Sequence, residues 1–408
     1  MSKGKWNYND RVLDVILMVF IALTMSSLIL SPTFLNPISL FAKVCIAEVI
    51  LVFILHATKR PKRNVALSYI QVGLLFAVAA SLISNPSMNS NKDLLSYILI
   101  MFIGLQLVSI TPPNTIILGV ALSGVTTILI TNFAIIFSPQ TAISAEGQLQ
   151  GIYGHWNSFG MALILALPAV FTFTLERKKL QRALKALLAL VIFIYVILSQ
   201  SSTSLLAYIA LTLAWIIYIA YIRSHKLAVI LLSSLGLIGT TIIVYPSLLF
   251  QMLGKSETLT GRVQIWEAIV NQANSHWLFG YGWATIIPID SELFNRIVSY
   301  SGIPARHVHN DFLNWFALTG LVGIVFIVGF FAITLFGGTS YLKDHMTLNN
   351  LWVPLTVFGL IIEGISETPT ITPQGWLLIT LTLAVIGTHN ESWTRKFYFP
   401  PKKHWITA

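Results

Sequence analysis

The chain has 408 residues, of which 55% are hydrophobic and only 10% are charged, and its formal net charge is +10. A composition this apolar excludes a soluble globular fold, and with it a soluble basic domain that binds nucleic acid. Cys45 is the single cysteine, so neither a disulfide nor a cysteine metal site is expected.

Apolar stretches long enough to cross a bilayer recur from one end of the chain to the other. They predict an all-α polytopic membrane protein with about twelve transmembrane helices. The first stretch is too long for a cleavable signal peptide and lacks a small-residue cleavage site. The expected spans are 12–30, 38–57, 65–84, 93–111, 115–137, 157–176, 184–200, 203–222, 226–246, 310–338, 350–367 and 370–388.

Basic residues gather in alternate connections between these spans. This alternation is what the positive-inside rule requires of an even number of spans with both termini in the cytoplasm. The positive charge is therefore expected to meet anionic lipid headgroups. The clusters are Lys3/Lys5/Arg11, Lys59/Arg60/Lys62/Arg63, Arg177/Lys178/Lys179/Arg182/Lys185, Arg223/Lys226, Lys343 and Arg395/Lys396/Lys402/Lys403.

Residues 1–408 are interpreted as one integral membrane domain with one long loop on the outer face. Apolar residues at positions 263, 266, 269, 270 and 273 predict an amphipathic helix in that loop, lying on the membrane. The expected parts are helices 1–5 in 1–137, helices 6–9 with outer-face polar motifs in 138–246, the extracytoplasmic loop in 247–308, and helices 10–12 with a cytoplasmic tail in 309–408.

A first polar group stands at the outer start of the helix expected near residue 157. It contains His155 and Asn157, both candidates for contact with a substrate. A helix cap at Asn157 or Ser158, with neighbouring aromatic residues in the interfacial belt, explains the same group without a substrate. A serine-rich turn that includes Ser202 and Thr203 then leads into the next helix.

Arg262 begins the amphipathic helix, one turn before Trp266. A guanidinium group binds phosphate bidentately and is always charged, so Arg262 and Arg306 are candidate phosphate ligands. A lipid headgroup contact, or a surface ion pair with Glu257 or Glu267, accounts equally well for Arg262.

The most polar segment runs from Arg306 to Asp311, where the long loop enters an apolar helix. His309 is a candidate general base, because histidine titrates near neutrality and the positive end of a helix favours its neutral form. Asn310 and Asp311 also suit a helix cap. A metal held by His307 and His309 is not expected, because no carboxylate-rich cluster accompanies them.

Helices expected to begin near 157, 203, 310 and 370 direct their N-termini to one side of the membrane. If these helices are neighbours, their positive ends form an anion-binding bowl with Arg262 and Arg306. Glu363 and Glu367, at the outer end of the eleventh helix, are functional candidates because ionisable groups are costly in a membrane. Solvation of Glu367 in a loop is the alternative.

Four blocks in this order resemble the O-antigen polymerase and ligase superfamily, which includes exopolysaccharide polymerases. The resemblance covers 150–330. The blocks are Gly151 to Gly160, like G-x-(F/Y)-x-H-x-N-x-x-G; Leu198 to Leu206, a serine-rich turn into a helix; Gly261-Arg262-Val263-Gln264-Ile265-Trp266 with Gly280-Tyr281-Gly282; and His307 to Leu313 with Gly320-Leu321-Val322-Gly323, like H-x-H-N-x-x-L…G-x-x-G.

The resemblance implies a GT-C-like membrane glycosyltransferase of the bacterial cytoplasmic membrane. Such enzymes move a glycan from undecaprenyl diphosphate to an acceptor hydroxyl on the outer face, without a metal or another cofactor. By residue match, Arg262 would bind the diphosphate and His309 would deprotonate or orient the acceptor, while Asn310 and Asp311 would hold that histidine or the sugar. Further substrate-binding candidates are Arg306, His307, Trp266, His155, Asn157, Ser202, Thr203 and Glu367.

Two residues depart from the family pattern. Ser202 stands where many members carry an arginine, so Arg306 is expected to complete the diphosphate clamp. Trp277 replaces a proline, which is expected to change the docking of the loop rather than the chemistry. The implied partners are the lipid-linked donor, a glycan or lipid-linked acceptor, membrane lipids, and chain-length regulator and flippase proteins.

The function expected from these observations is an extracytoplasmic glycan polymerase. A ligase that moves the glycan to lipid A-core, a protein or a wall polymer is the nearest alternative. A flippase or another transporter is the second, but it would place polar residues near mid-membrane and not on one face. A purely structural scaffold would leave the histidine–arginine loop unexplained.

Overall fold

A computed structural model describes residues 8–26, 39–57, 65, 67–84, 91–227, 229–230, 261–272, 276–284, 286–344 and 348–389. These residues form α-helices, short 3-10 turns and one isolated bridge between Ile143 and Leu149. The α-helices are α1 (Tyr8–Met25), α2 (Leu40–Ala57), α3 (Tyr69–Ser84), α4 (Asn91–Ile110), α5 (Pro113–Phe137), α6 (Pro139–Ala142), α7 (Trp156–Thr172), α8 (Lys178–Ser199), α9 (Ser202–Arg223), α12 (Arg262–Gln272), α13 (Glu292–Ser301), α14 (Asp311–Asp344), α15 (Trp352–Gly364) and α16 (Pro373–His389). The 3-10 turns are η2 (Gly151–Tyr153), η5 (Leu348–Leu351) and η6 (Pro369–Ile371).

Among the described helices, 4 are long and apolar enough to cross a membrane: Pro113–Phe137, Lys178–Ser199, Ser202–Arg223 and Asp311–Gly338. Shorter apolar helices accompany them at α3, α4, α7, α15 and α16. This is the composition of a polytopic membrane protein. Each expected span coincides with an observed helix except 226–246, which lies almost wholly outside the described residues. The count of twelve spans stays a prediction.

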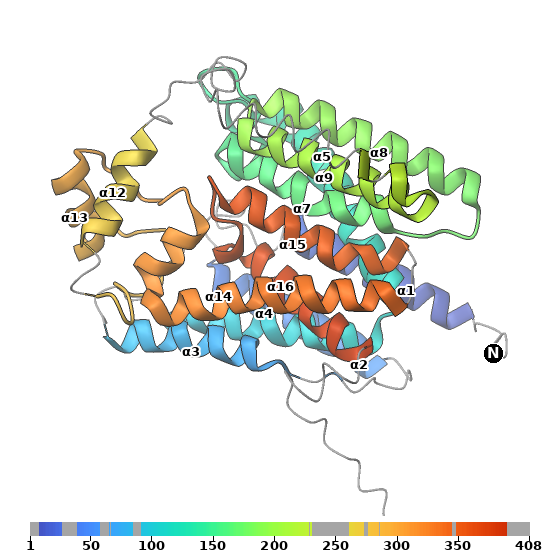
Figure 1. The fold of residues 1–408 in the computed structure, drawn as a ribbon, viewed down its shortest axis with the longest axis horizontal. Coiled ribbons are helices and arrows are strands. Elements are labelled where there is room, and N and C mark those ends of the chain that lie inside the picture. Colours follow the sequence, from blue (N-terminus) through green and yellow to red (C-terminus); the bar gives the residue numbers. More distant parts are fainter. Residues whose placement is uncertain are drawn as a thin grey trace, which may run out of the picture.

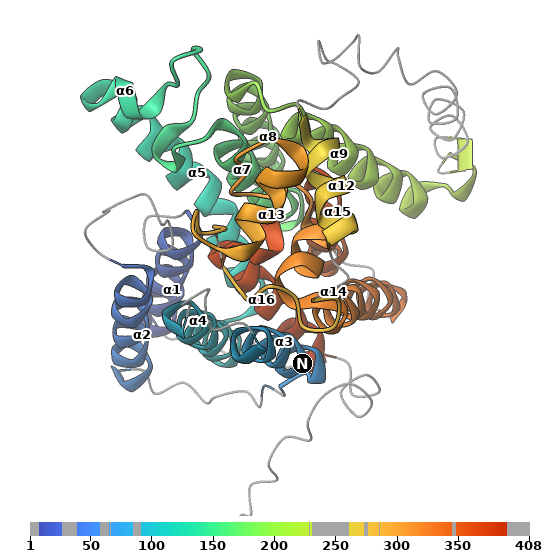
Figure 2. The same cartoon turned by 90° about the vertical axis from the view of Figure 1, so that its left-hand side faces the viewer.

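The long helices lie side by side in a bundle, and α12 and α13 cover one end of it (Figures 1 and 2). Helix α7 is central, because it contacts α5, α8, α9 and α15. On the other side of the bundle α14 packs on α3, and α16 packs on α4. Arg262, at the start of α12, hydrogen-bonds to Ser366 and Glu367 in the turn that follows α15.

Helix α12 is present where the apolar pattern placed it, and protein covers part of its apolar face, while Val270 stays exposed. Ile265, Ala268 and Ile269 are buried, and α13 is the helix that α12 contacts most. Helix α13 offers Leu293 and Ile297, which are also buried. Two amphipathic helices that pack face to face remove apolar surface from water without a membrane. The position of this helix pair on the membrane surface stays a prediction.

Helix α14 is interrupted at Gly320, whose backbone (φ 64°, ψ −158°) is not helical. The segment before α13 hydrogen-bonds to the interruption: Tyr281 N–H donates to Ala317 O and Leu321 N–H donates to Trp277 O, both at 2.8 Å. Gly280 and Gly320 make this contact possible, since each backbone lies against the other segment where a side chain would stand. This pairing satisfies the backbone groups that the break exposes in an apolar region.

We expect Gly280→Ala to destabilise the protein far more than Gly302→Ala. The two glycines have nearly equal φ angles, +72° and +70°, so the cost of placing alanine in the left-handed region is matched at about 1–2 kcal/mol. A Cβ on Gly280 would lie 2.4 Å from the backbone of Leu318, whereas a Cβ on Gly302 meets nothing within 4 Å. Overpacking adds about 1–3 kcal/mol. Thermal unfolding in detergent measures both, and equal losses would contradict the proposed close approach.

Candidate active site

The turn that follows α15, residues 365–372, joins the starts of four helices. Asn157 in the first turn of α7 donates to Glu367, and Thr203 in the first turn of α9 shares a 2.5 Å hydrogen bond with Ser366. Asn310, which caps α14, donates to the carbonyl of Ile365 at 2.9 Å. Helix α16 begins at the end of the same turn. The starts of α7, α9 and α14 therefore contact one segment, and α16 begins at its end, so the condition for an anion-binding bowl, that these helices are neighbours, is met.

Glu367 is the hub of the polar cluster at this end of the bundle. Its Oε1 accepts from Nη2 of Arg262 at 3.0 Å and from Nδ2 of Asn157 at 2.6 Å, and its Oε2 lies 3.4 Å from Nδ1 of His309. The Glu367 side chain is 12% exposed and that of Arg262 is 13% exposed. Burial alone would raise the pKa of Glu367, but the hydrogen bond with His309 and the charge of Arg262 outweigh it and lower the pKa.

Arg262 is held on two sides. Its Nη1 donates to the carbonyl of Ser366 at 2.5 Å while its Nη2 meets Glu367. Glu367, and not Glu267, is the ion-pair partner of Arg262 among the described residues, and Glu257 lies outside them. Two of the five N–H donors of a guanidinium are used in these bonds, so others remain for an anion.

His309 has an unusual backbone. Its φ is +54°, which a residue with a side chain rarely adopts, and such strain is typical of functional positions. Trp266 supports it: the indole N–H donates to the carbonyl of Val308 at 2.9 Å and so ties α12 to this segment. Because Nδ1 faces Glu367, Nε2 is the ring nitrogen of His309 that this contact does not use.

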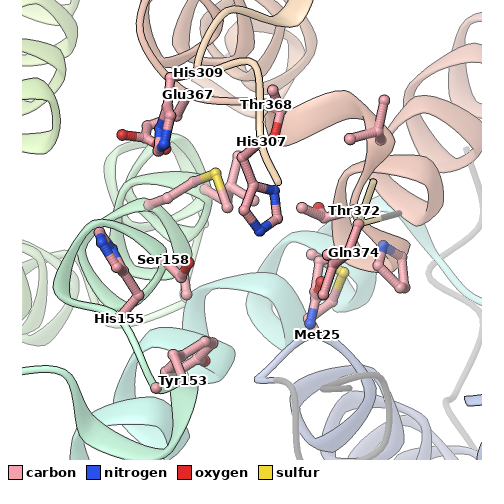
Figure 3. Close-up of a pocket in the computed structure, with 17 residues that line it drawn as sticks. Met25, Tyr153, His155, Ser158, His307, His309, Glu367, Thr368, Thr372 and Gln374 are labelled. Atoms are coloured by element: carbon pink, nitrogen blue, oxygen red, sulfur yellow. The ribbon is translucent and has the colours of Figure 1, made fainter. Parts of the chain in front are cut away.

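A cavity of about 360 Å³ opens beside Glu367 and His309 (Figure 3). Three imidazoles, those of His155, His307 and His309, stand around its polar end, and His155 lies on the opposite wall from His307. The rest of the wall is mostly apolar and follows α7 as far as Leu165. The lining residues are Met25, Tyr153, Gly154, His155, Ser158, Met161, Ala162, Leu165, Ile286, His307, His309, Glu367, Thr368, Ile371, Thr372, Pro373 and Gln374.

Asn310 and Asp311 are bound into the scaffold at the start of α14. The side chain of Asn310 accepts from the N–H of Leu313 at 2.9 Å, which makes it the helix cap that the sequence allows. Asp311 is 1% exposed and accepts from the hydroxyl of Thr370 at 2.6 Å. Thr370 in turn accepts from the indole N–H of Trp315 at 2.7 Å. Both residues thus fix the start of α14, two residues after His309.

The remaining candidates lie around the cluster rather than within it. Arg306 is exposed and its Nε donates to the carbonyl of Ile287 at 3.2 Å. Ser202 is the first residue of α9, and Ser201 before it caps the helix by accepting from the N–H of Ser204. Within the described residues, Glu367 contacts Arg262, His309 and Asn157 directly. His155 and His307 line the same cavity.

Sequence reasoning missed two residues of this region, Ser366 and Thr370. Ser366 contacts both Arg262 and Thr203, and Thr370 bonds to the buried Asp311. The Arg262–Glu367 pair was missed as well, because its partners are far apart in the chain. The hydroxyl-rich stretch between Ser366 and Thr372 was the available signal, since polar residues clustered between two apolar helices need partners in the protein. No group of three or more histidine, cysteine, aspartate or glutamate residues that could hold a metal is found among the described residues.

We expect Glu367→Gln to cost about 3–5 kcal/mol of stability, because it leaves the buried guanidinium of Arg262 without a counter-ion. Glu292→Gln is the matched control. Glu292 pairs with Arg296 at 2.8 Å, but its side chain is 41% exposed, so the loss should stay below about 1 kcal/mol. Thermal or chemical unfolding of the two purified variants measures the difference. Similar losses would show that the Glu367 pair is not buried as described.

The lowered pKa of Glu367 predicts that the protein loses stability at acid pH. A carboxyl with a folded pKa below its unfolded value near 4.5 stabilises the protein above that pH, and the contribution is lost as the pH falls through the folded pKa. The melting temperature of the wild type should therefore drop as the pH falls below about 4.5, and Glu367→Gln should lose less over the same range. An identical acid response in the two proteins would contradict the lowered pKa.

Comparison with known proteins gives one family. Residues 186–328 match the family model described as O-antigen ligase, a segment that includes Arg262 and His309 and ends before Glu367. No curated protein matches the chain. The matched segment and the polar cluster therefore overlap in the loop and helix that carry Arg262 and His309. This match over residues 186–328 supports the resemblance of the chain to the O-antigen polymerase and ligase superfamily.

Proposed function

We propose that the protein is a membrane glycosyltransferase that joins glycan repeat units carried on undecaprenyl diphosphate. The observation that carries the proposal is the cluster in which Glu367 links Arg262 to His309 at the mouth of a cavity. The reaction requires binding of an anionic leaving group and removal of one proton. The guanidinium serves the first, and the imidazole with its carboxylate partner serves the second.

The chemistry follows from the orientation of His309. Glu367 accepts the Nδ1–H of the imidazole, so Nε2 is the basic nitrogen. The acceptor hydroxyl attacks the anomeric carbon of the donor and gives its proton to Nε2. The bond between that carbon and the diphosphate breaks, and the diphosphate leaves with the electron pair. Glu367 stabilises the imidazolium that forms, while Arg262 offers its remaining N–H donors to the leaving group.

The shape of the cavity supports a lipid-linked donor. Its polar end holds the imidazoles, and its apolar walls extend along α7 to Leu165, nine residues into the helix from Trp156. At a rise of about 1.5 Å per residue, this wall is on the order of 13 Å long. A molecule with an anionic head and an apolar chain fits such a cavity, because each part meets matching surface.

The placement of basic residues supports an outer-face site. Helix α8 begins with Lys178 and Lys179, and α9 ends with Arg223. The other ends of both helices, Ser199 and Ser202, lie at the end of the bundle where Thr203 meets Ser366. The basic ends are therefore opposite the cavity. By the positive-inside rule the basic ends are cytoplasmic, so the cavity faces outward.

A ligase is the second candidate, and the description of the matched family as O-antigen ligase favours it. It would use the same donor and the same base. The two functions differ in the acceptor, which is a second lipid-linked glycan for a polymerase and a lipid A-core, protein or wall polymer for a ligase.

We expect the purified protein, given a lipid-linked repeat unit, to produce a ladder of longer glycans on a gel. His309→Ala should lower the rate by at least about 100-fold, because it removes the base. Arg262→Ala should lower the rate by a similar factor, because it removes the positive charge that stabilises the leaving diphosphate and leaves Glu367 without its ion-pair partner. His276→Ala and Arg296→Ala are the matched controls, since both residues pair with Glu292 and do not line the cavity. Both controls should form the wild-type ladder.

The acceptor decides between the two functions. Elongation without any added acceptor supports the polymerase. Transfer only when lipid A-core, a protein or a wall polymer is supplied would establish the ligase instead. No transfer with any of these acceptors, from protein that is folded by its melting curve, would overturn the enzymatic proposal.

A further inference from the structure

His155 carries a hydrogen-bonding pattern that fixes which of its ring nitrogens bears a proton. It caps α7 from an extended backbone (φ −155°, ψ 135°), and its Nδ1 accepts from the N–H of Asn157 at 3.1 Å. A ring nitrogen that accepts a hydrogen bond has no proton of its own. In neutral His155 the proton therefore lies on Nε2, on the side of the ring away from the first turn of α7.

The surroundings of His155 keep it neutral. Burial lowers the pKa of His155, Glu367 opposes this effect, and the charge of Arg262 acts in the same direction as burial. Protonation would also place a second N–H on Nδ1, where it would face the N–H of Asn157 and break the cap. The neutral form is thus required by the geometry of the cap as well as by the charges nearby.

The position of His155 gives its Nε2–H access to a ligand. His155 lines the cavity on the wall opposite His307, close to Ser158 (Figure 3). Its ring stacks on Trp156 with 4.1 Å between centroids and 23° between planes, which holds the ring in one orientation. A donor that is fixed in direction before the ligand arrives loses little entropy when it binds.

We propose that His155 is a neutral hydrogen-bond donor, through Nε2–H, to a phosphate oxygen of the lipid-linked substrate. The proposal rests on the function proposed above. A phosphate oxygen only accepts hydrogen bonds, and Nε2–H of this tautomer only donates. Because Glu367 already neutralises much of the charge of Arg262, an uncharged donor on the cavity wall supplies attraction that the arginine alone does not. Being neutral, His155 binds the leaving group without competing with His309 for the proton of the acceptor.

Nuclear magnetic resonance of protein labelled with 15N at histidine, in lipid nanodiscs, tests the tautomer without an activity assay. The signals of His155 are those that disappear in His155→Asn. We expect the Nε2–H tautomer across the neutral pH range. An imidazolium at neutral pH, or a proton on Nδ1, would overturn the proposal.

The same sample tests the ligand. Inorganic pyrophosphate should shift the Nε2–H signal of His155, and glucose at the same concentration should leave it in place. A shift with glucose alone, or a pyrophosphate effect restricted to other histidines, overturns the assignment to phosphate. The protein could show the expected tautomer and pyrophosphate shift and still transfer no glycan to any acceptor. That result would support the anion site at His155 and overturn the proposed glycosyltransferase function.

An activity assay of a His155 variant distinguishes its proposed role as a hydrogen-bond donor from its role as a helix cap. Asparagine is a favoured N-cap residue, so His155→Asn keeps the cap, but its shorter side chain does not reach the substrate. We expect an unchanged melting temperature and a rate lower by about 100- to 1000-fold. The acid limb of the pH–rate profile should stay where it is, because His155 does not titrate there. A wild-type rate in His155→Asn, or a displaced acid limb, would contradict the proposed role.

Discussion

The site depends on how one buried carboxylate is compensated. Glu367 is 12% exposed, and an ionised carboxylate in such a place is costly unless charge and hydrogen bonds surround it. Arg262 supplies the charge, and Asn157 and His309 supply polar contacts. These three residues come from α12, from α7 and from the segment before α14. A single charge that must be satisfied therefore fixes the position of three separate parts of the chain.

This compensation also limits what Arg262 can do alone. Its charge is largely balanced by Glu367, and Glu367, not Arg262, lines the cavity. The field that an anionic substrate meets is therefore weaker than the sequence indicates. Hydrogen-bond donors that carry no charge become important in such a site, because they attract a phosphate without first having to be freed from a counter-ion. His155 meets this condition, because its Nδ1 contact with α7 puts the proton on Nε2 of a side chain that lines the cavity.

Local pattern was enough to predict much of this structure. Hydropathy located the long helices, since the length of an apolar run reports directly on a helix that can span a membrane. The cap at Asn310 was predicted from chemistry at a helix start. The Arg262–Glu367 pair was not, because its two residues are linked only through the tertiary fold. The contact between α12 and α13 was missed for a related reason: an amphipathic face looks the same in sequence whether lipid or another helix covers it.

The break in α14 could not be predicted from sequence either, and it explains how the residues of the site are held in position. Glycine is common in membrane helices, so hydropathy predicts one continuous span over 310–338 and does not indicate that Gly320 leaves the helix. In the structure the break docks the segment around Gly280 onto α14 and fixes the loop that leads to α13. The short first part of α14, before Gly320, is held at one end by this docking and at its start by Asn310 and Asp311. A strained backbone at His309, which costs about 1–3 kcal/mol, persists only where both flanks are held this firmly.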